Sequence, residues 1–402
     1  MYNAVGIDVS KGKSTVAVLQ PAGVIIRKPF NVNHTSSELD ELAKYIGSLE
    51  GETRVVLECT GRYHEPVVKT LSEAGLFVSA VNPHRIKNFG NNSIRKVKSD
   101  PADAKKIARY TLDNWIELRQ YSSMDNTRTQ LKTLNSQFSF FMKQKVAAKA
   151  NLIALLDNTY PGVNKLFDSP VRDDGSEKWV DYAYSFWHVD CVRKIGLKTF
   201  TERYQAFCKK HHYNFQPAKP AELFLASKDL IAVFPKEASY KLLIQQSIQQ
   251  LNLASSHVEE LRSKMNELAS TLPEYATVMG MYGVGKTFGP QLIAEIGDIS
   301  NFSHREALTA FAGVDPGVDQ SGTHNSKSNK ASKCGSNRLR KTLFQIMSTL
   351  LQTAPEDDKV YQFLVKKRAE GKPYYVYMTA GANKFLRIYY GKVKECIRNL
   401  EQ

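Results

Sequence analysis

The chain has 402 residues, 42% of them hydrophobic and 24% charged, and is long enough for about two or three folded domains. Its 55 Lys and Arg residues outnumber 40 Asp and Glu residues and give a net charge of +15, which favours nucleic acid, before an acidic membrane surface, as partner. No apolar run approaches the ~18 residues that span a bilayer, the start lacks a secretory signal, and the five scattered cysteines suggest reduced thiols, so we expect a cytoplasmic, nucleoid-associated protein.

Residues 1–118 alternate strand and helix patterns. Three short β-rich runs over 4–30 read as an antiparallel meander, and a mostly apolar strand over 53–61 and another over 76–81 follow. Helical spacing precedes and follows each of these later strands, and a last helix begins at Asp100. Three meander strands, followed by helices that alternate with parallel strands, predict an α/β domain of RNase H-like order.

Four acidic residues lie on three separate elements of this domain. Asp8 is in the first strand, Glu58 ends the apolar strand, and Asp100 and Asp103 open the last helix on one face. Carboxylates at the ends of adjacent parallel strands meet at one edge, where two of them ~4 Å apart repel by roughly 4 kcal/mol. Hard oxygen ligands select Mg²⁺ or Mn²⁺ over zinc, so we expect a divalent metal site. Taken singly, each acid also fits a turn or an N-cap.

Residues 119–272 carry two apolar stripes at alternating three–four spacing, from Leu131 to Leu155 and from Ile244 to Leu272. These stripes predict two long helices that pair as an antiparallel coiled coil, although plain bundle core is the alternative. An insertion of uncertain fold lies between them, over 157–235. It holds His188, Cys191, Cys208 and His211 at a spacing that zinc can use, but the chain between them reads as ordinary amphipathic helix.

The segment GMYGVGKT, from Gly280 to Thr287, matches the phosphate-binding loop of nucleotide hydrolases. That loop follows a β-strand, whereas the pattern here reads as helix, GVG turn and helix, and residues 273–402 are helical and poor in strands. A helix-hairpin-helix fits better, with Gly283, Gly285 and Lys286 presented to a nucleic-acid phosphate. We therefore expect no nucleotide cofactor.

Two stretches are rich in basic residues. One is the loop before Asp100 and the other follows Thr323, with no acid up to Leu343. The residues that we expect to contact nucleic acid there are Arg85, Lys87, Arg95, Lys96, Lys98, Lys327, Lys330, Lys333, Asn337, Arg338 and Arg340. Ser321 precedes the second stretch, beside Gly322, where a ligand can approach the backbone. A serine hydroxyl is a weak nucleophile until a base or metal activates it, and alone Ser321 also fits an ordinary loop serine.

Six separated motifs resemble the DEDD transposases of insertion-sequence family one-ten, the bridge-RNA-guided recombinases. In the order of that family they are GIDVSK, LECTGRY, KSDPADAKKIA, the GVG hairpin with LIAEIGDISNF, AGVDPG with QSG, and CGSNRLRKTL. The resemblance spans nearly the whole chain and is weakest over 157–235. It implies a RuvC-like domain over 1–118, the coiled-coil domain over 119–272 and a transposase domain over 273–402.

The resemblance also assigns roles. It implies that Asp8, Glu58, Asp100 and Asp103 bind Mg²⁺ and that Ser321 attacks a DNA phosphodiester to form a phosphoserine link. It further implies donor and target DNA, a structured bridge RNA that selects the target by base pairing, and a dimer or tetramer in which the acids of one protomer meet the serine of another. The rival hypotheses are a structure-selective nuclease that activates water, like a Holliday-junction resolvase, a P-loop motor, and a non-catalytic nucleic-acid-binding protein.

Overall fold

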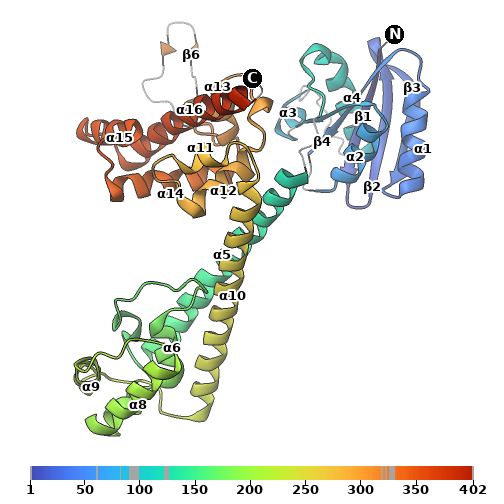
Figure 1. The fold of residues 1–402 in the computed structure, drawn as a ribbon. Coiled ribbons are helices and arrows are strands. Elements are labelled where there is room, and N and C mark those ends of the chain that lie inside the picture. The colour runs from blue at the N-terminus through green and yellow to red at the C-terminus, as the bar shows by residue number, and fades with distance from the viewer. Residues whose placement is uncertain are drawn as a thin grey trace. The chain divides into compact units, whose positions relative to one another are not determined.

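The computed structural model describes residues 2–59, 62–81, 83–89, 99–121, 126–317, 320–321, 324–325 and 331–400. By their contacts they form two compact units, Met1–Ser123 and Met124–Gln402 (Figure 1). The second unit therefore contains both the long helices and the C-terminal helices, and the three predicted domain ranges stay a prediction.

The first unit is built on a five-stranded mixed sheet with the order β3-β2-β1-β4-β5. Strands β1, β2 and β3 form an antiparallel meander, and β4 and β5 add to β1 in parallel, which confirms the predicted order. The strands are β1 Tyr2–Ser10, β2 Lys13–Gln20, β3 Val24–Asn33, β4 Glu52–Glu58 and β5 Phe77–Val81. The helices are α1 Ser36–Gly47, α2 Glu65–Glu73, α3 Pro83–Asn88 and α4 Asp100–Asp113, with short 3-10 turns at Pro21–Gly23 and Trp115–Glu117.

Alternate residues of the central strands face two different layers of this unit. Ile7 and Leu57 are fully buried in one core together with Leu71 of α2. On the other face Val56 packs in a second core with Ile107 of α4. Because side chains alternate along a strand, Gly6, Asp8 and Glu58 belong to the face that α4 covers.

The second unit begins with two long antiparallel helices, α5 Asn126–Asp157 and α10 Ala238–Ser270 (Figure 1). Three contacts between them show that the chain runs in opposite directions in the two helices. The Arg262 guanidinium lies over the Phe138 ring, the rings of Phe141 and His257 are 4.7 Å apart, and Asn151 lies 3.3 Å from Ser247. The predicted pairing of the two stripes is thus observed, whereas a supercoil stays a prediction.

The insertion between the long helices is a small helical subdomain with an aromatic core. Its elements are a 3-10 turn at Val163–Lys165 and the helices α6 Lys178–Ser185, α7 Asp190–Arg193, α8 Leu197–Lys210 and α9 Lys219–Lys228. The core is formed by buried rings, among them Tyr160, Trp179, Tyr182, Phe200, Tyr204 and Phe207.

Two of the residues whose spacing zinc could use, His188 and Cys208, are buried inside the insertion. His188 is buried, its Nε2 lies 3.1 Å from the Phe234 carbonyl oxygen, and its Nδ1 accepts from the Asp190 amide. Cys208 is buried in the aromatic core. Across the part of the chain that the structure describes, no three His, Cys, Asp or Glu side chains are grouped as a metal site requires.

The remainder of the second unit is mostly helical. It comprises α11 Tyr275–Met279, α12 Gly285–Ile296, a 3-10 turn at Ile299–Asn301, α13 Arg305–Ala312, the two-residue strands β6 Gln320–Ser321 and β7 His324–Asn325, α14 Asn337–Thr353, α15 Lys359–Ala369 and α16 Tyr374–Leu400. Buried residues of α10, α12, α14 and α16 share one core with the start of α5. Of the helices described, none is long and apolar enough to cross a membrane.

Candidate active site

Asp8 and Glu58 lie next to each other at the carboxyl edge of the parallel strands. Strands β1 and β4 run parallel with Ile7 opposite Leu57, so Asp8 and Glu58 follow at the same level. Glu58 is the last residue of β4 and pairs with Val81 of β5. Both carboxylates are half-buried and project from the face that α4 covers, as the sequence predicts.

Gly6 allows the helix that carries the other two acids to approach. A Cβ atom on Gly6 would collide with the Ala104 carbonyl oxygen and lie 2.9 Å from the Ala108 Cα atom. Helix α4 therefore packs with its backbone directly on β1, two residues before Asp8. Pro101 lies in the first turn of α4, where a missing amide proton costs nothing, and the same turn contains Asp100 and Asp103.

The electrostatics of Glu58 show which acids come close. Burial raises the pKa of the Glu58 carboxyl first, and the negative charges of Asp8 and Asp103 raise it further, while Lys106 opposes them. Asp100 is exposed on the first turn of α4 and is not among these causes. The structure thus brings three of the four predicted acids within electrostatic reach.

The three acids do not form a closed metal-binding group. No set of three His, Cys, Asp or Glu among the described residues is close enough to hold a metal ion. The donor set still fits a hard divalent cation, because carboxylate oxygens are its preferred ligands and a cation would offset the repulsion that raises the pKa of Glu58.

Ser321 lies on an antiparallel hairpin rather than in an irregular loop. The backbone at Ser332 donates to Asp315 at 3.0 Å and that at Lys333 donates to Gly313 at 3.2 Å. Further out Pro316 bridges to Ala331, and β6 pairs with β7, with Ser321 opposite His324. The side chain of Ser321 lies outside the described residues, so the structure places its backbone only.

The two chain segments at the foot of this hairpin, at Phe311–Gly313 and at Gly335, are in direct backbone contact. A Cβ atom on Gly335 would collide with the Phe311 carbonyl oxygen and lie 2.7 Å from the Gly313 nitrogen. Gly313 itself has φ +65°, a left-handed conformation that favours glycine. The Arg340 guanidinium donates to the Ala312 carbonyl oxygen at 3.0 Å, so a residue predicted to bind nucleic acid also holds the foot of the hairpin.

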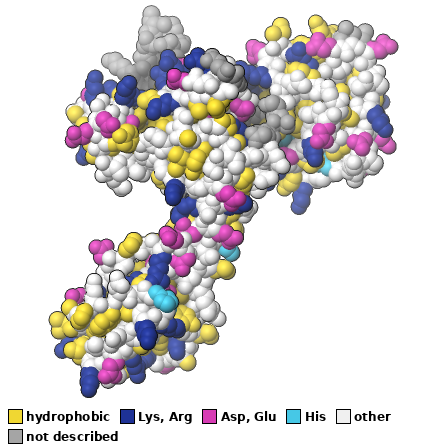
Figure 2. All heavy atoms as spheres, in the orientation of Figure 1, with side chains coloured by type: hydrophobic (Ala, Val, Ile, Leu, Met, Phe, Trp, Pro, Cys, Tyr) yellow, Lys and Arg dark blue, Asp and Glu magenta, His cyan; other side chains and the backbone are white. Residues whose placement is uncertain are grey.

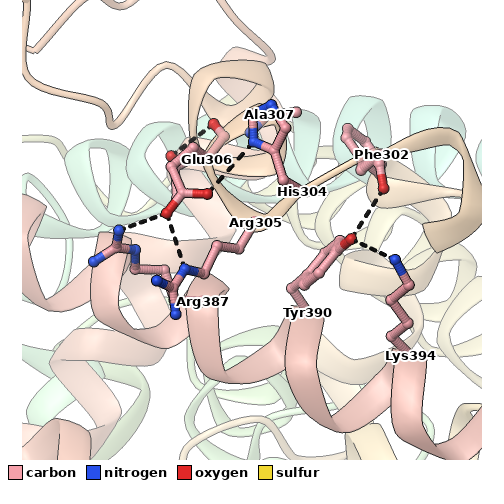
Figure 3. A network of polar contacts seen from close by, with 9 residues as sticks. Phe302, His304, Arg305, Glu306, Ala307, Arg387, Tyr390 and Lys394 are labelled. Atoms are coloured by element: carbon pink, nitrogen blue, oxygen red, sulfur yellow. Dashed lines mark hydrogen bonds and ion pairs between the residues drawn. The ribbon is translucent and has the colours of Figure 1, made fainter.

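Helix α13 leads into the hairpin and is tied to α16 by surface contacts (Figure 3). The Glu306 carboxylate accepts hydrogen bonds from Arg305 at 2.9 Å and from Arg387 at 2.7 Å. These two hydrogen bonds lower the pKa of Glu306 to about 2. Beside them the Tyr390 hydroxyl donates to the Phe302 carbonyl oxygen at 3.1 Å. The contacts join the start of α13 to α16 at the surface.

The GVGKT segment follows a helix, not a strand. Helix α11 spans only Tyr275–Met279, shorter than the predicted first helix of a helix-hairpin-helix, which stays unconfirmed. Gly283 has φ +77° and α12 begins at Gly285. Lys286 is exposed, and its carbonyl oxygen accepts from Asn266 of α10 at 2.8 Å.

The other predicted nucleic-acid contacts divide into three groups. Arg85 and Lys87 are exposed on α3, and Lys333, Asn337 and Arg338 are exposed near the start of α14. The remaining five lie outside the described residues: Arg95, Lys96, Lys98, Lys327 and Lys330. On the face shown in Figure 2, Lys and Arg side chains gather over the C-terminal helices, in agreement with the net charge of the chain.

Comparison with known proteins identifies the class and then the family. Residues 5–161 match the IS110-type DEDD transposase model, and residues 275–362 match that of the transposases of the IS116/IS110/IS902 family. Both regions are thus those of a transposase, an enzyme that acts on DNA. Together the two matches cover more than half of the chain, which belongs to the IS110 family of transposases.

Two individual proteins are similar to this chain. The insertion element IS116 uncharacterized 44.8 kDa protein of Streptomyces clavuligerus is 21% identical over 371 residues, which are 91% of this chain and 88% of that protein. The solved structure of T. thermophilus RuvC in complex with a Holliday junction substrate matches 29% of this chain and 96% of its own, with 14% identity and a TM-score of 0.23.

Proposed function

We propose that this transposase cuts and rejoins DNA at insertion-sequence ends and at the target, with Ser321 as the nucleophile and Asp8, Glu58, Asp100 and Asp103 as Mg²⁺ ligands. The observation that carries the proposal is that Asp8 and Glu58 lie at one edge of the sheet and that Asp103 opens the helix packed on it. Burial first, and then the charges of Asp8 and Asp103, raise the pKa of Glu58. Acidic side chains that lie close together and shift one another's pKa are typical of functional sites.

The reaction that we propose begins with the Ser321 hydroxyl. Its oxygen loses a proton and bonds to a DNA phosphorus, while the bond from phosphorus to the sugar oxygen breaks and leaves a free hydroxyl. A hydroxyl of another strand then attacks the phosphoserine, which releases Ser321 and joins the strands. The chemistry that bound Mg²⁺ supplies is polarisation of the phosphate and stabilisation of charge on the attacking and leaving oxygens.

Substrate binding in this proposal depends on the basic residues. Lys286, at the start of α12, and Arg338, in the first turn of α14, are exposed next to helix N-termini, where phosphate binds favourably. A structured guide RNA would select the target by base pairing, so that the protein needs only backbone contacts. The resemblance to bridge-RNA-guided members supports an oligomer in which acids and serine come from different protomers.

The alternative is a metal-dependent, structure-selective nuclease that activates water. It is favoured by one observation: the sheet, α4 and the converging acids all lie within the first compact unit. Such an enzyme would cut DNA without Ser321 and without a covalent intermediate.

One experiment separates the two functions. The protein is incubated with Mg²⁺, its flanking non-coding RNA, and donor and target DNA, and the products are run on a denaturing gel. We expect a protein–DNA adduct and joined strands with the natural sequence and neither with Ser321→Ala. Cutting that survives in Ser321→Ala would support the nuclease and contradict the recombinase.

A further inference from the structure

A buried carboxylate in α12 connects two distant parts of the second unit. Glu295 is only 6% exposed. One of its oxygens accepts a hydrogen bond from Asn135 Nδ2 at 2.8 Å, and the other accepts from Ser336 Oγ at 3.1 Å. Within the described part of the chain, no Lys, Arg or His forms an ion pair with it. The hydrogen bonds of a buried polar group offset the cost of removing it from water, so these two bonds hold the Glu295 side chain in this position.

Ser336 lies at the foot of the hairpin that carries Ser321. Its hydroxyl also accepts from the Leu339 amide at 3.2 Å and so caps α14. Its own amide donates to the Phe311 carbonyl oxygen at 2.8 Å, directly beside the close crossing of Gly335 over Phe311. A shift of Ser336 would therefore change the start of α14 and the foot of the hairpin together.

Asn135, the other partner, belongs to the long helix α5 and is 2% exposed. Among the described residues its buried Oδ1 atom has no hydrogen-bond partner, so the bond from its Nδ2 atom to Glu295 fixes this amide. Seven residues earlier on α5, Arg128 pairs with Glu274 at 3.1 Å and donates to the Gly297 carbonyl oxygen at 3.2 Å. Polar contacts from α5 thus hold both the end of α12 and the segment before α11.

We propose that Glu295 is a positioning residue, whose carboxylate fixes the serine-bearing hairpin to helix α5 through Asn135 and Ser336. The chain of contacts runs from α5 through α12 to the foot of the hairpin, and each link is a hydrogen bond of 3.1 Å or less. The consequence for catalysis rests on the proposed function: with Glu295 replaced, DNA still binds but Ser321 forms its adduct more slowly.

The structure offers a matched control in the same pair of helices. Thr342 of α14 is 4% exposed and donates to Gln291 Oε1 of α12 at 3.2 Å. Thr342→Val removes a buried hydrogen bond between the same helices without contact to the hairpin. Glu295→Gln keeps the side-chain size with one acceptor and one donor and serves as the conservative variant.

The first measurement is hydrogen exchange of the full-length protein, read at the amides of Ser332, Lys333 and Ser336. We expect exchange to be about tenfold faster in Glu295→Ala than in Thr342→Val, and within about twofold of the natural protein in Glu295→Gln. Asn135→Ala removes the hydrogen bond at the other end of this series and should act like Glu295→Ala. It therefore provides a second test if Glu295→Ala does not fold.

Equal exchange at these amides in Glu295→Ala and Thr342→Val would overturn the proposal, because Glu295 would then be no more than a part of the helix packing. The second measurement is the rate of adduct formation on the denaturing gel, with DNA binding measured alongside. Faster exchange together with a slower adduct at unchanged DNA binding supports the positioning role. Exchange could be faster in Glu295→Ala while even the natural protein forms no adduct. That result would leave the role of Glu295 in the hairpin intact and would refute the proposed function instead.

Discussion

The acids of the first unit and the serine of the second unit are held in place by different means. The acids of the first unit project from regular elements, where Gly6 lets α4 pack against β1 and buried neighbours such as Ile7 and Leu57 fix the strands. Ser321 lies on two-residue strands of a hairpin whose foot depends on backbone hydrogen bonds and on Glu295. Regular strands and a helix packed on them therefore position the acids, whereas a few single hydrogen bonds position the foot of the hairpin.

The largest effect is expected where the acids act directly. Asp8→Asn keeps the size of the side chain and removes one charge, so we expect DNA cutting to fall by on the order of 10³-fold. The control is Asp113→Asn at the exposed far end of α4, which should leave cutting unchanged. Full activity of Asp8→Asn on the denaturing gel would show that this carboxylate is not part of the reaction.

A large structural effect is expected at the close approach of α4. In Gly6→Ala the new Cβ atom meets backbone of Ala104 and Ala108, which cannot move aside, so we expect a loss of about 3 kcal/mol in the free energy of unfolding. Gly47→Ala, where a Cβ would meet nothing within 4 Å, is the matched control. Urea unfolding followed by circular dichroism compares the two, and equal stabilities would contradict the packing described.

Mg²⁺ should stabilise the first unit through the crowded acids. Because the neighbouring charges raise the pKa of Glu58, a cation that binds the folded state relieves the repulsion. At 100 times its dissociation constant it adds about 2.7 kcal/mol. Mg²⁺ should raise the thermal unfolding midpoint of the natural protein, and EDTA should reverse this rise. Most of the rise should be lost in Glu58→Gln. An unchanged shift in Glu58→Gln would place the metal elsewhere.

The smallest effect is expected at the surface contacts of α13. Glu306 and Arg387 are exposed neighbours, and an exposed ion pair contributes little to stability. Arg387→Ala should thus barely change the unfolding midpoint, and high salt should reduce even that change. A drop as large as that of Gly6→Ala would mean that α13 is held mainly by this pair.

The placement of the acids was largely predictable because each of them lies on a regular element whose period can be read from the sequence. The period of two along β1 and β4 places Asp8 and Glu58 on one face, and the parallel register brings them to one edge. Asp100 is exposed in the first turn of α4 and Asp103 is half-buried, and the role of Asp100 as a metal ligand stays a prediction.

The serine hairpin and the insertion were less predictable. The strands of the hairpin are only two residues long, too short to give a recognisable alternation in the sequence. Its foot depends on Glu295 and Ser336, which are 41 positions apart, and no periodicity of the sequence relates them. The paired glycines Gly313 and Gly335 were the available sign of a close crossing. The aromatic core of 157–235 forms from several short helices, whose mutual packing no periodicity specifies.

The most direct test of the central claim is to locate the DNA on the protein. The adduct formed with Mg²⁺, guide RNA and DNA is digested with protease and nuclease, and the modified peptide is sequenced by mass spectrometry. We expect a nucleotide phosphate on Ser321 with the natural sequence and none with Asp8→Asn or in EDTA. A phosphate on another residue, or an adduct that forms without the acids, would contradict it.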